Sequence, residues 1–277
     1  MTFTAKMCGL TFGENHPPHV MGILNLSPES FYKNSVRDSS SILDAAQKMI
    51  DDGATMLDVG ARSTSPWAET ISVEDEKTRL FSALKELSGN ISVPISVDTM
   101  YAGVAEAALS LGAEIINDIS SLKNDPLMGK VIADYNACAV LMATQKTPGD
   151  PLGMDAVMSS LSNAISNAEN AGIDPQKIIL DPAVGHWIPE KTAAYDFDVI
   201  NRFEKFGVFE MPILVAVSRK SFLNEVIEKP AEDRLISSLT AATIAAYKGG
   251  HIIRTHDVSE TADAVKVISA IRNQKEL

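Results

Sequence analysis

The segment ISVDTMYAGVAEAALSLGAEIIND (residues 95–118) holds one full copy of the pattern that decides the fold. Its first apolar run, 95–98, is too short for a helix and predicts a buried strand. Residues 102–111 then carry apolar side chains at helical spacing, and Gly112 can close that helix in a left-handed conformation. The apolar run 115–118 predicts a second strand. A strand, a helix and another strand in this order indicate a parallel βαβ unit.

The same alternation extends over the whole chain of 277 residues. Apolar runs typical of strands buried on both faces lie at 19–26, 55–59, 95–98, 115–118, 137–142, 178–181, 213–217 and 252–254. Helical patterns lie at 39–52, 73–87, 102–111, 127–136, 154–171, 192–206, 233–248 and 259–271, and we expect the helices to be closed by Gly53, Gly112, Gly172, Gly207 and Gly249. With no composition break, this predicts one domain, residues 1–277, folded as a single (β/α)8 TIM barrel. An open doubly wound sheet is disfavoured because no G-x-G-x-x-G follows the first strand.

Composition and charge exclude several classes of protein. Hydrophobic residues make up 45% and the net charge is -12, which disfavours general binding to nucleic acids or membrane surfaces. Cys8 and Cys138 belong to no Cys/His cluster, so we expect neither a disulfide framework nor a zinc site, and Cys138 should be a small core residue. No apolar run reaches the roughly 20 residues of a membrane span, and the first residues lack a signal-peptide pattern. We therefore expect a cytoplasmic protein.

Polar residues cluster where the predicted strands end. In a barrel, catalytic groups come from the carboxyl ends of the strands and from the loops that follow. Each such residue alone could cap a helix or satisfy local backbone. Their recurrence at nearly every strand end favours one shared site, formed by Asn25, Asp58, Asp98, Asn117, Asp118, Asp181, Ser218, Arg219, Lys220, Arg254, His256 and Asp257.

One group of these residues suits a flat heterocycle. Asp98, Asn117 and Asp181 offer hydrogen-bond acceptors, and the amide of Asn117 also donates. Such side chains match a ring edged with N–H and C=O groups. Lys220 adds a cation that can meet a ring carbonyl. These four residues therefore predict a site for a polar ring.

A second group suits phosphate. Arg219, Arg254 and His256 would supply positive charge. Asn25 can bind a pyrophosphate oxygen, or a magnesium ion that the pyrophosphate mainly holds. A polar ring beside a diphosphate is the ligand that both groups together predict.

The motifs that carry these residues resemble those of the dihydropteroate synthase family. MGILNLSPESF (21–31) is similar to the family's opening signature MGILN-x-TPDSF, and DVGARSTSP (58–66) is similar to its second signature. SVDT (96–99), INDIS (116–120), ILDP (179–182), VSRKSF (217–222) and RTHDV (254–258) follow in the family's order. The resemblance runs from the first strand to the eighth. It implies a transferase of folate biosynthesis that joins 6-hydroxymethyl-7,8-dihydropterin diphosphate to an aryl amine, with release of pyrophosphate.

The resemblance also implies roles for individual residues. Those implied to hold the pterin are Asp98, Asn117, Asp181 and Lys220, with Met142 lining the slot. Asn25, Arg254 and His256 would hold the diphosphate, and Asn25 its Mg2+ as well. Thr64, Ser221 and His186 would lie near the aryl amine. Asp181, Lys220 and Arg254 would be the catalytic residues, which stabilise the pterin cation and the departing pyrophosphate. The family resemblance further implies a homodimer formed through helices near the carboxyl terminus.

The aryl-amine region departs from the family pattern. Ser65 stands where the family usually has Arg, Trp67 replaces a Gly, and DPAVGHW (181–187) replaces DPGFGFGK, which puts His186 in the place of an aromatic residue. Two explanations stay open. The amine is 4-aminobenzoate and the loops have drifted, or the chain is an archaeal-type member of methanopterin synthesis that takes a ribosylated aminobenzene phosphate. In the second case Lys33, Arg37, Arg62 and Lys146 would meet the extra phosphate.

Two other functions compete with this interpretation. A pterin-dependent methyltransferase with a corrinoid partner shares the barrel and the pterin-holding residues, but it has no use for a diphosphate site. The pair of motifs SRKS and RTHD disfavours it. A non-catalytic pterin-binding protein is the other alternative, and the intact set of polar strand ends disfavours that as well.

Overall fold

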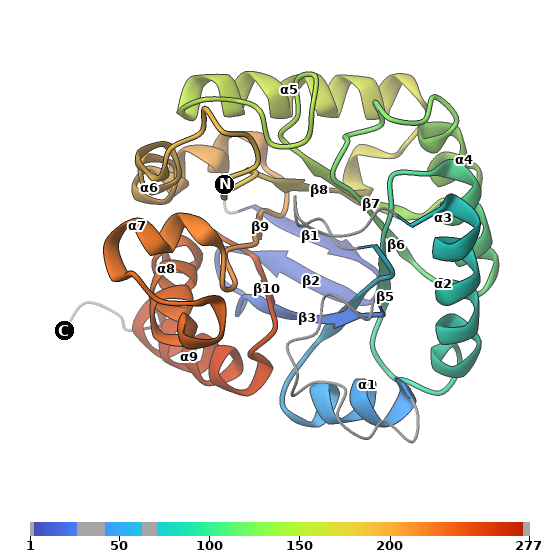
Figure 1. Ribbon diagram of the computed structural model, residues 1–277, viewed down its shortest axis with the longest axis horizontal. Helices are drawn as coiled ribbons and strands as arrows, with labels where there is room; N and C mark the ends of the chain where they lie inside the picture. Colours follow the sequence, from blue (N-terminus) through green and yellow to red (C-terminus); the bar gives the residue numbers. More distant parts are fainter. Residues whose placement is uncertain (1–2, 27–41, 63–70, 274–277) are drawn as a thin grey trace.

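A closed parallel barrel forms the centre of the structure, a computed structural model that describes residues 3–26, 42–62 and 71–273. Within these residues eight strands pair in the order β8-β7-β6-β5-β4-β3-β10-β9 (Figure 1). A parallel bridge between Leu180 and Ile213 joins the two ends of the sheet. The predicted TIM barrel is confirmed, with strands β3 (His19–Asn25), β4 (Met56–Gly60), β5 (Ile95–Asp98), β6 (Ile115–Asp118), β7 (Cys138–Met142), β8 (Ile178–Asp181), β9 (Leu214–Val215) and β10 (Ile252–Thr255).

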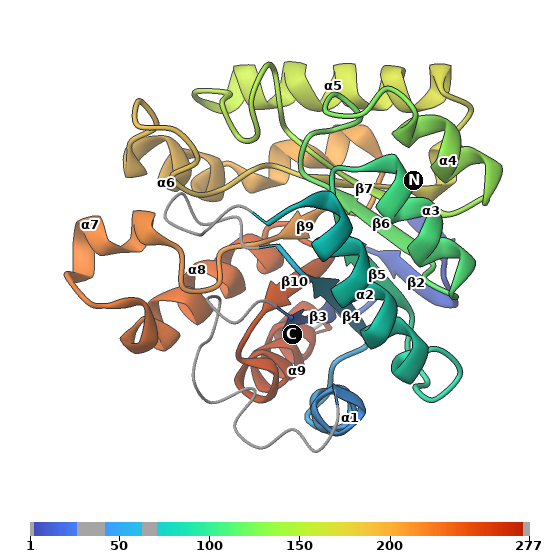
Figure 2. The same cartoon turned by 45° about the vertical axis from the view of Figure 1, so that its right-hand side comes forward.

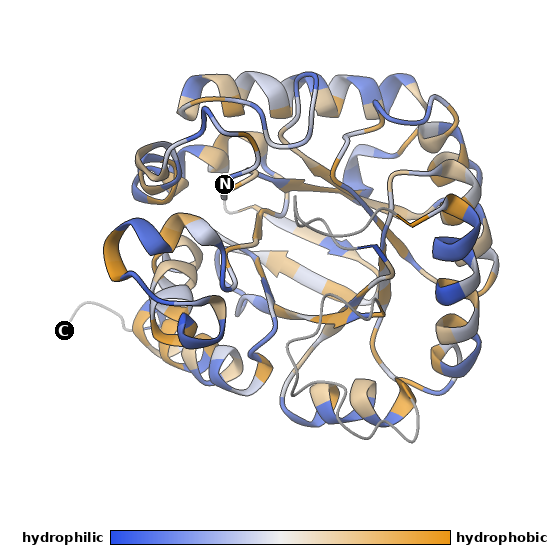
Figure 3. Cartoon of the chain, in the orientation of Figure 1, coloured by the Kyte–Doolittle hydropathy of each residue, from blue (hydrophilic) through white to orange (hydrophobic). Residues whose placement is uncertain are grey.

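Helices surround this barrel, and Figure 2 shows them following one another around the sheet. Figure 3 shows that the strands are largely apolar, whereas the helices carry hydrophilic as well as hydrophobic residues. Among the described residues no helix is both long and apolar enough to span a membrane. The α-helices are α1 (Ile42–Asp51), α2 (Val73–Leu87), α3 (Ala102–Ser110), α4 (Met128–Asp134), α5 (Met154–Asn170), α6 (Ala193–Asn201), α7 (Asn224–Ile227), α8 (Leu235–Tyr247) and α9 (Val258–Arg272), and 3-10 turns lie at η1 (Pro175–Lys177), η2 (Phe203–Phe209), η3 (Ser221–Leu223) and η4 (Ala231–Asp233).

The predicted helix 192–206 is wrong in its second half. The chain leaves α6 at Asn201 and continues as the 3-10 turn η2. Phe203 and Phe206 are buried there in edge-to-face contact, with ring centroids 5.1 Å apart. Side chains three residues apart lie on the same side of a 3-10 turn, which allows this contact. Glu210, with φ 50°, takes the left-handed position that was expected for Gly207, whereas the other four predicted helix-closing glycines do have positive φ.

A β-hairpin that the sequence did not predict covers the amino-terminal end of the barrel. It consists of β1 (Thr4–Met7) and β2 (Leu10–Gly13), and Figure 1 shows both strands across the barrel opening. Met7 and Phe12 are buried against Met21 and other apolar residues near the starts of the barrel strands. The hairpin therefore closes this end with apolar side chains.

The barrel interior changes from apolar to polar along the strands. In β6, Ile115 belongs to the apolar layer beside the hairpin, and Asn117 lies one step further along the same face. In β8, Ile179 and Asp181 repeat this arrangement. Because successive strand residues alternate between two faces, residues two apart share the interior. The polar strand ends therefore lie above an apolar floor, at the carboxyl end of the barrel.

Candidate active site

Neighbouring strands bring the predicted residues to one level of the rim. Strand pairing aligns Asn25 with Gly60, Gly60 with Asp98, and Asp98 with Asn117. A Cβ atom at Gly60 would lie 3.5 Å from Asp98 Cβ and 3.8 Å from Asn25 Oδ1. Glycine at this position therefore leaves open the space between the Asn25 amide and the Asp98 carboxylate.

Asp58 connects three residues of the rim by hydrogen bonds. Its fully buried carboxylate accepts hydrogen bonds from Ser96 Oγ at 2.6 Å, Asn117 Nδ2 at 3.0 Å and Arg254 Nε at 2.6 Å. Charge-assisted bonds of this kind fix the geometry of both partners. The sequence marked Asp58 only as a polar strand residue, and the structure shows it orienting both Asn117 and Arg254.

Arg254 bridges two carboxylates. Besides Asp58, it donates from Nη2 to Asp98 Oδ2 at 3.0 Å. Burial lowers the pKa of the Arg254 guanidinium, but Asp58 and Asp98 outweigh that effect and the pKa is raised. Arg254 therefore remains charged, and its charge is shared with two acidic neighbours.

Asp98 and Asn117 are unusually placed for ligand binding. Burial raises the pKa of Asp98 to about 7, although Arg254 opposes the shift. Asn117 is 3% exposed, and its Oδ1 is buried without a hydrogen-bond partner among the described residues. A buried acceptor left unpaired costs about 1–3 kcal/mol. A ligand N–H group at this point would recover that cost.

Asp181 and Lys220 interact electrostatically on the part of the rim formed after β8 and β9. Asp181 accepts a hydrogen bond from the Ala183 N–H at 2.8 Å, and burial raises its pKa while Lys220 lowers it. Lys220 donates from Nζ to the Val184 carbonyl at 2.5 Å and lies 4.9 Å from the centre of the Trp187 ring. Burial lowers the pKa of Lys220 to about 8, against the influence of Asp181.

The loop after β8 rests on a buried ion pair that no sequence motif indicated. Lys191 donates to the Ala183 carbonyl at 2.6 Å, and its Nζ lies 3.5 Å from Asp196 Oδ1. Asp196 accepts from the Gly185 N–H at 2.8 Å. Ala183 and Gly185 have φ of 59° and 135°, so this loop needs such support. The pair holds the segment that presents the Val184 carbonyl to Lys220.

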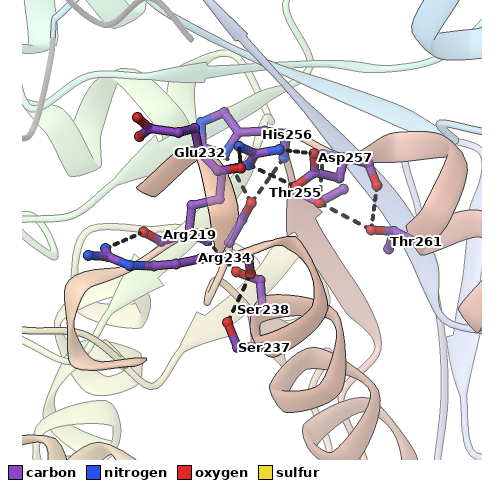
Figure 4. Close-up of polar contacts among 10 residues, drawn as sticks. Arg219, Glu232, Arg234, Ser237, Ser238, Thr255, His256, Asp257 and Thr261 are labelled. Carbon is purple, nitrogen blue, oxygen red and sulfur yellow. Dashed lines mark hydrogen bonds and ion pairs between the residues drawn. The ribbon is translucent and has the colours of Figure 1, made fainter. Parts of the chain in front are cut away.

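Arg219, which was predicted to supply charge for a phosphate, is paired with Asp257 in this structure. It donates from Nε to Asp257 Oδ2 at 2.9 Å and forms a second bond from Nη2 to Asp257 Oδ1 (Figure 4). It also donates from Nη1 to the Glu232 carbonyl at 3.0 Å. The backbone N–H of Arg219 donates to Ser238 Oγ at 2.7 Å. Because a guanidinium and a carboxylate form a rigid two-bond pair, Arg219 ties the loop after β9 to the loop after β10.

His256 lies in the predicted place but is not a cation. Its ring Nδ1 is 3.0 Å from Ser218 Oγ, and its backbone N–H donates to the same hydroxyl at 3.2 Å. Burial, followed by the charge of Arg254, lowers the pKa of His256 to about 4. The expected positive charge is therefore absent at neutral pH, and the imidazole is suited to hydrogen bonding.

The remaining predicted residues have varied positions. Met142 is fully buried at the end of β7 and pairs with Asp181 in the sheet. Ser221 is exposed at the start of η3. His186 is half-buried with its Nε2 unpaired among the described residues. Thr64 lies outside the described residues, and so do Lys33, Arg37, Ser65 and Trp67.

Two of the cations suggested for an extra phosphate lie within the described part of the chain. Arg62 donates from Nε to Glu76 Oε2 at 2.9 Å, and its guanidinium lies 5.3 Å from the centre of the Tyr101 ring. Lys146 is exposed in the loop after β7. Arg62 is thus already engaged by a buried carboxylate, which weakens the case for a phosphorylated amine.

The charge balance of the rim fits a metal ion that arrives with a diphosphate. Asp58 and Asp98 offset the charge of Arg254, and His256 is neutral. The described residues contain no group of three or more His, Cys, Asp or Glu side chains that could hold a metal by themselves. Mg2+ commonly takes one or two protein oxygens together with substrate phosphates. Asn25 is the rim residue whose amide oxygen suits that arrangement.

Known proteins resemble this chain in sequence and in fold. The pterin binding enzyme family matches residues 21–256. Dihydropteroate synthase of Bacillus subtilis is 38% identical over 92% of this chain and 89% of its own length. The Yersinia pestis dihydropteroate synthase, solved with a sulfonamide drug, is 34% identical with a TM-score of 0.88 over 99% of this chain and 100% of that one. The Xanthomonas albilineans dihydropteroate synthase, solved with 4-aminobenzoic acid, is 30% identical with a TM-score of 0.85 over 99% and 100%.

Proposed function

This chain belongs to the dihydropteroate synthase family of pterin-binding transferases, which act in folate biosynthesis, and we propose how its residues divide the reaction. The family assignment decides against the corrinoid-dependent methyltransferase and against a non-catalytic pterin-binding protein. The observation that carries the proposal is the network in which Asp58 orients both Asn117 and Arg254. It couples a ring-binding amide to an anion-binding guanidinium through one carboxylate.

The pterin ring would occupy the space between Asp98, Asn117, Asp181 and Lys220, above Met142. The Oδ1 of Asn117, which has no hydrogen-bond partner among the described residues, supports this, because it offers an acceptor to a ring N–H. Lys220 would donate to the ring carbonyl. As the C–O bond of the substrate ionises, the buried carboxylate of Asp181 would stabilise the cation that develops on the pterin. This proposal gives Asp181 an electrostatic role and requires no covalent intermediate on the protein.

The diphosphate would lie against Arg254, His256 and Asn25. Arg254 would stabilise the charge of the departing pyrophosphate, and His256 would donate a hydrogen bond as a neutral imidazole. Asn25 would give its amide oxygen to Mg2+, which neutralises negative charge on the diphosphate when bound. The two carboxylates beside Arg254 support the need for that additional cation.

The amine is proposed to be 4-aminobenzoate, bound near Ser221, His186 and Thr64. The engagement of Arg62 with Glu76 supports this choice over a ribosylated aminobenzene phosphate. In this chain His186 replaces the usual aromatic residue, so an imidazole would flank the amine ring. Its Nε2 is buried and has no hydrogen-bond partner in the described part of the chain, so it would bond to the substrate.

The proposed functional unit is a homodimer formed through α8 and α9. Exposed apolar residues support it: Ile236, Ile244 and Tyr247 lie on one face of α8, while Val267 and Ile271 lie one turn apart on α9. Arg272 at the end of α9 donates to the Tyr247 carbonyl at 3.1 Å, which brings the two groups together. Grouped apolar side chains of this kind mark interaction surfaces.

Pyrophosphate release tests the proposed roles. With dihydropterin diphosphate, 4-aminobenzoate and Mg2+, the protein should release one pyrophosphate for each pteroate formed. Removing a preorganised charge from an active site lowers kcat by about 10²–10³-fold, so Asp181→Asn and Arg254→Gln should each have this effect. Arg202→Gln, which removes the guanidinium of the half-buried Arg202–Asp198 pair at the end of α6, is the matched control. Near-normal turnover in Asp181→Asn would refute its assigned role.

A further inference from the structure

Two cysteines meet at the end of the barrel opposite the active site. Cys8 lies in the turn of the β1–β2 hairpin, and Cys138 is the first residue of β7. Their Sγ atoms are 2.9 Å apart, although 130 residues separate them in the sequence. Both are free thiols, with Cys138 buried and Cys8 half-buried. The reaction at the other end of the barrel uses neither of them.

The two sulfur atoms are closer than unbonded sulfurs normally approach. A disulfide bond is about 2.05 Å long, so these atoms would need to move together by only roughly 0.9 Å. Met7, Leu10 and Phe12 of the hairpin pack on the same apolar layer as Cys138, which holds the contact in place. No large movement of the backbone is therefore needed to join them.

The hairpin turn is an unusual place for cysteine. Cys8 and Gly9 have φ of 49° and 73°, the two left-handed positions of a type I′ turn. Asn, Asp or Gly normally occupies the first of these positions, because other side chains are strained there. This gives a matched replacement, since Asn at position 8 keeps the turn and removes the sulfur.

Nearby groups favour ionisation at Cys138. The hydrogen bond between the two cysteines lowers the pKa of Cys138, burial and the carboxylates of Glu114 and Asp174 oppose this, and Lys177 lowers it further. The same hydrogen bond and burial raise the pKa of Cys8. The thiolate, which is the reactive form of cysteine, would therefore be on Cys138.

We propose that Cys8 and Cys138 are a redox modification site, at which a peroxide forms a disulfide that locks the amino-terminal hairpin onto the barrel. The Cys138 thiolate attacks a peroxide oxygen, the O–O bond breaks, and the released hydroxide takes up a proton. Cys138 is then a sulfenic acid. The sulfur of Cys8 loses its proton and attacks Cys138, the S–O bond breaks and water leaves. Two thiols and one peroxide thus give one disulfide and two waters.

The test follows thiols, mass and thermal stability of the full-length protein before and after hydrogen peroxide. Oxidation should remove both titratable thiols, lower the intact mass by two hydrogen atoms and give one cross-linked peptide containing residues 8 and 138. A cross-link that closes so long a loop should raise Tm by roughly 10 °C, and dithiothreitol should reverse the change. None of these readouts depends on turnover, so the outcome is independent of the proposed function.

Cys8→Asn and Cys138→Ala are the control variants. In both, peroxide should leave Tm unchanged and yield no cross-linked peptide, and Cys8→Asn should keep the Tm of the reduced protein because the turn is preserved. The proposal is overturned if the native protein keeps both thiols under peroxide. It is equally overturned if the thiols oxidise to sulfinic or sulfonic acids without cross-linking, or if the cross-linked protein melts at the same temperature as the reduced one.

Discussion

Lys220 shows how burial adjusts a single residue for its role. Its pKa is lowered to about 8 by burial and held up by Asp181. A lysine that must donate to a ring carbonyl works only while protonated. We therefore expect kcat/KM for the pterin diphosphate to fall as pH rises through about 8, by tenfold per pH unit at the limit.

The matched variant for this prediction is Lys220→Arg, because arginine stays protonated throughout this pH range. Its activity should be lower, since the guanidinium has a different shape, but the basic limb of the profile should disappear. The measurement is initial-rate kinetics between about pH 6 and pH 10. This range covers about two pH units on each side of the shifted pKa of Lys220. An unchanged basic limb in Lys220→Arg would assign that limb to another group.

Asp58 is the residue whose loss should damage the site most widely. It is fully buried and accepts three hydrogen bonds, one of them from Arg254. Removing one partner of a buried pair costs about 3–5 kcal/mol, so Asp58→Asn should lower the free energy of unfolding by this order. Urea unfolding measures it, with Glu106→Gln on the exposed surface of α3 as the control. A loss below about 1 kcal/mol, the size seen for surface pairs, would contradict this account.

At the scale of elements, the Arg219–Asp257 pair should couple the loops after β9 and β10. These loops carry Lys220 and His256, so their relative position matters to both halves of the site. Arg219→Gln and Asp257→Asn should each lower kcat/KM, and the double variant should be little worse than either. A coupling energy of about 1–3 kcal/mol is expected.

Arg219→Lys distinguishes geometry from charge in the same pair. Lysine keeps the charge but cannot form the two-bond contact. Compared with Arg219→Gln, Arg219→Lys should therefore recover more of the lost free energy of unfolding than of the lost kcat/KM. Arg202→Gln is the control, since it breaks a half-buried pair of the same residue types at the end of α6. Strictly additive losses in the double-mutant cycle would show that the two loops are positioned independently.

The barrel elements were predictable from the sequence because buried strands produce continuous apolar runs. The predicted strands 95–98, 115–118 and 178–181 agree with β5, β6 and β8 to the residue. The hairpin was missed because its strands have four residues each and its turn is Cys-Gly, without the usual Asn-Gly signal. The 3-10 turn η2 was missed because apolar residues three apart, such as Phe203 and Phe206, fit a 3-10 turn as well as an α-helix.

The positions of the site's polar residues could be predicted from the sequence, but their charges could not. Asp98, Asn117 and Arg254 lie together at the rim as expected. The neutral state of His256 depends on burial, which arises from residues distant in the chain. Lys191 and Asp196 could not be identified because only the folded loop brings them beneath Ala183 and Gly185.

At the scale of the whole molecule, the exposed apolar face of α8 and α9 should form the dimer contact. Ile236 is 77% exposed, and a carboxylate there would be buried against apolar atoms of a second copy. We expect Ile236→Asp to be monomeric by light scattering at concentrations where the unmodified protein is dimeric. Val226→Asp on α7, 65% exposed and outside this face, should remain dimeric. A dimer of unchanged stability in Ile236→Asp would exclude this face.

The central claim is that the pterin ring and the diphosphate bind side by side on one rim, joined through Asp58 and Arg254. A crystal structure with dihydropterin diphosphate and Mg2+ tests it most directly. The account predicts the ring between Asp98, Asn117, Asp181 and Lys220, with the diphosphate against Arg254, His256 and Asn25. A ring bound away from the Asn117 amide, or a diphosphate bound away from Arg254, would contradict it.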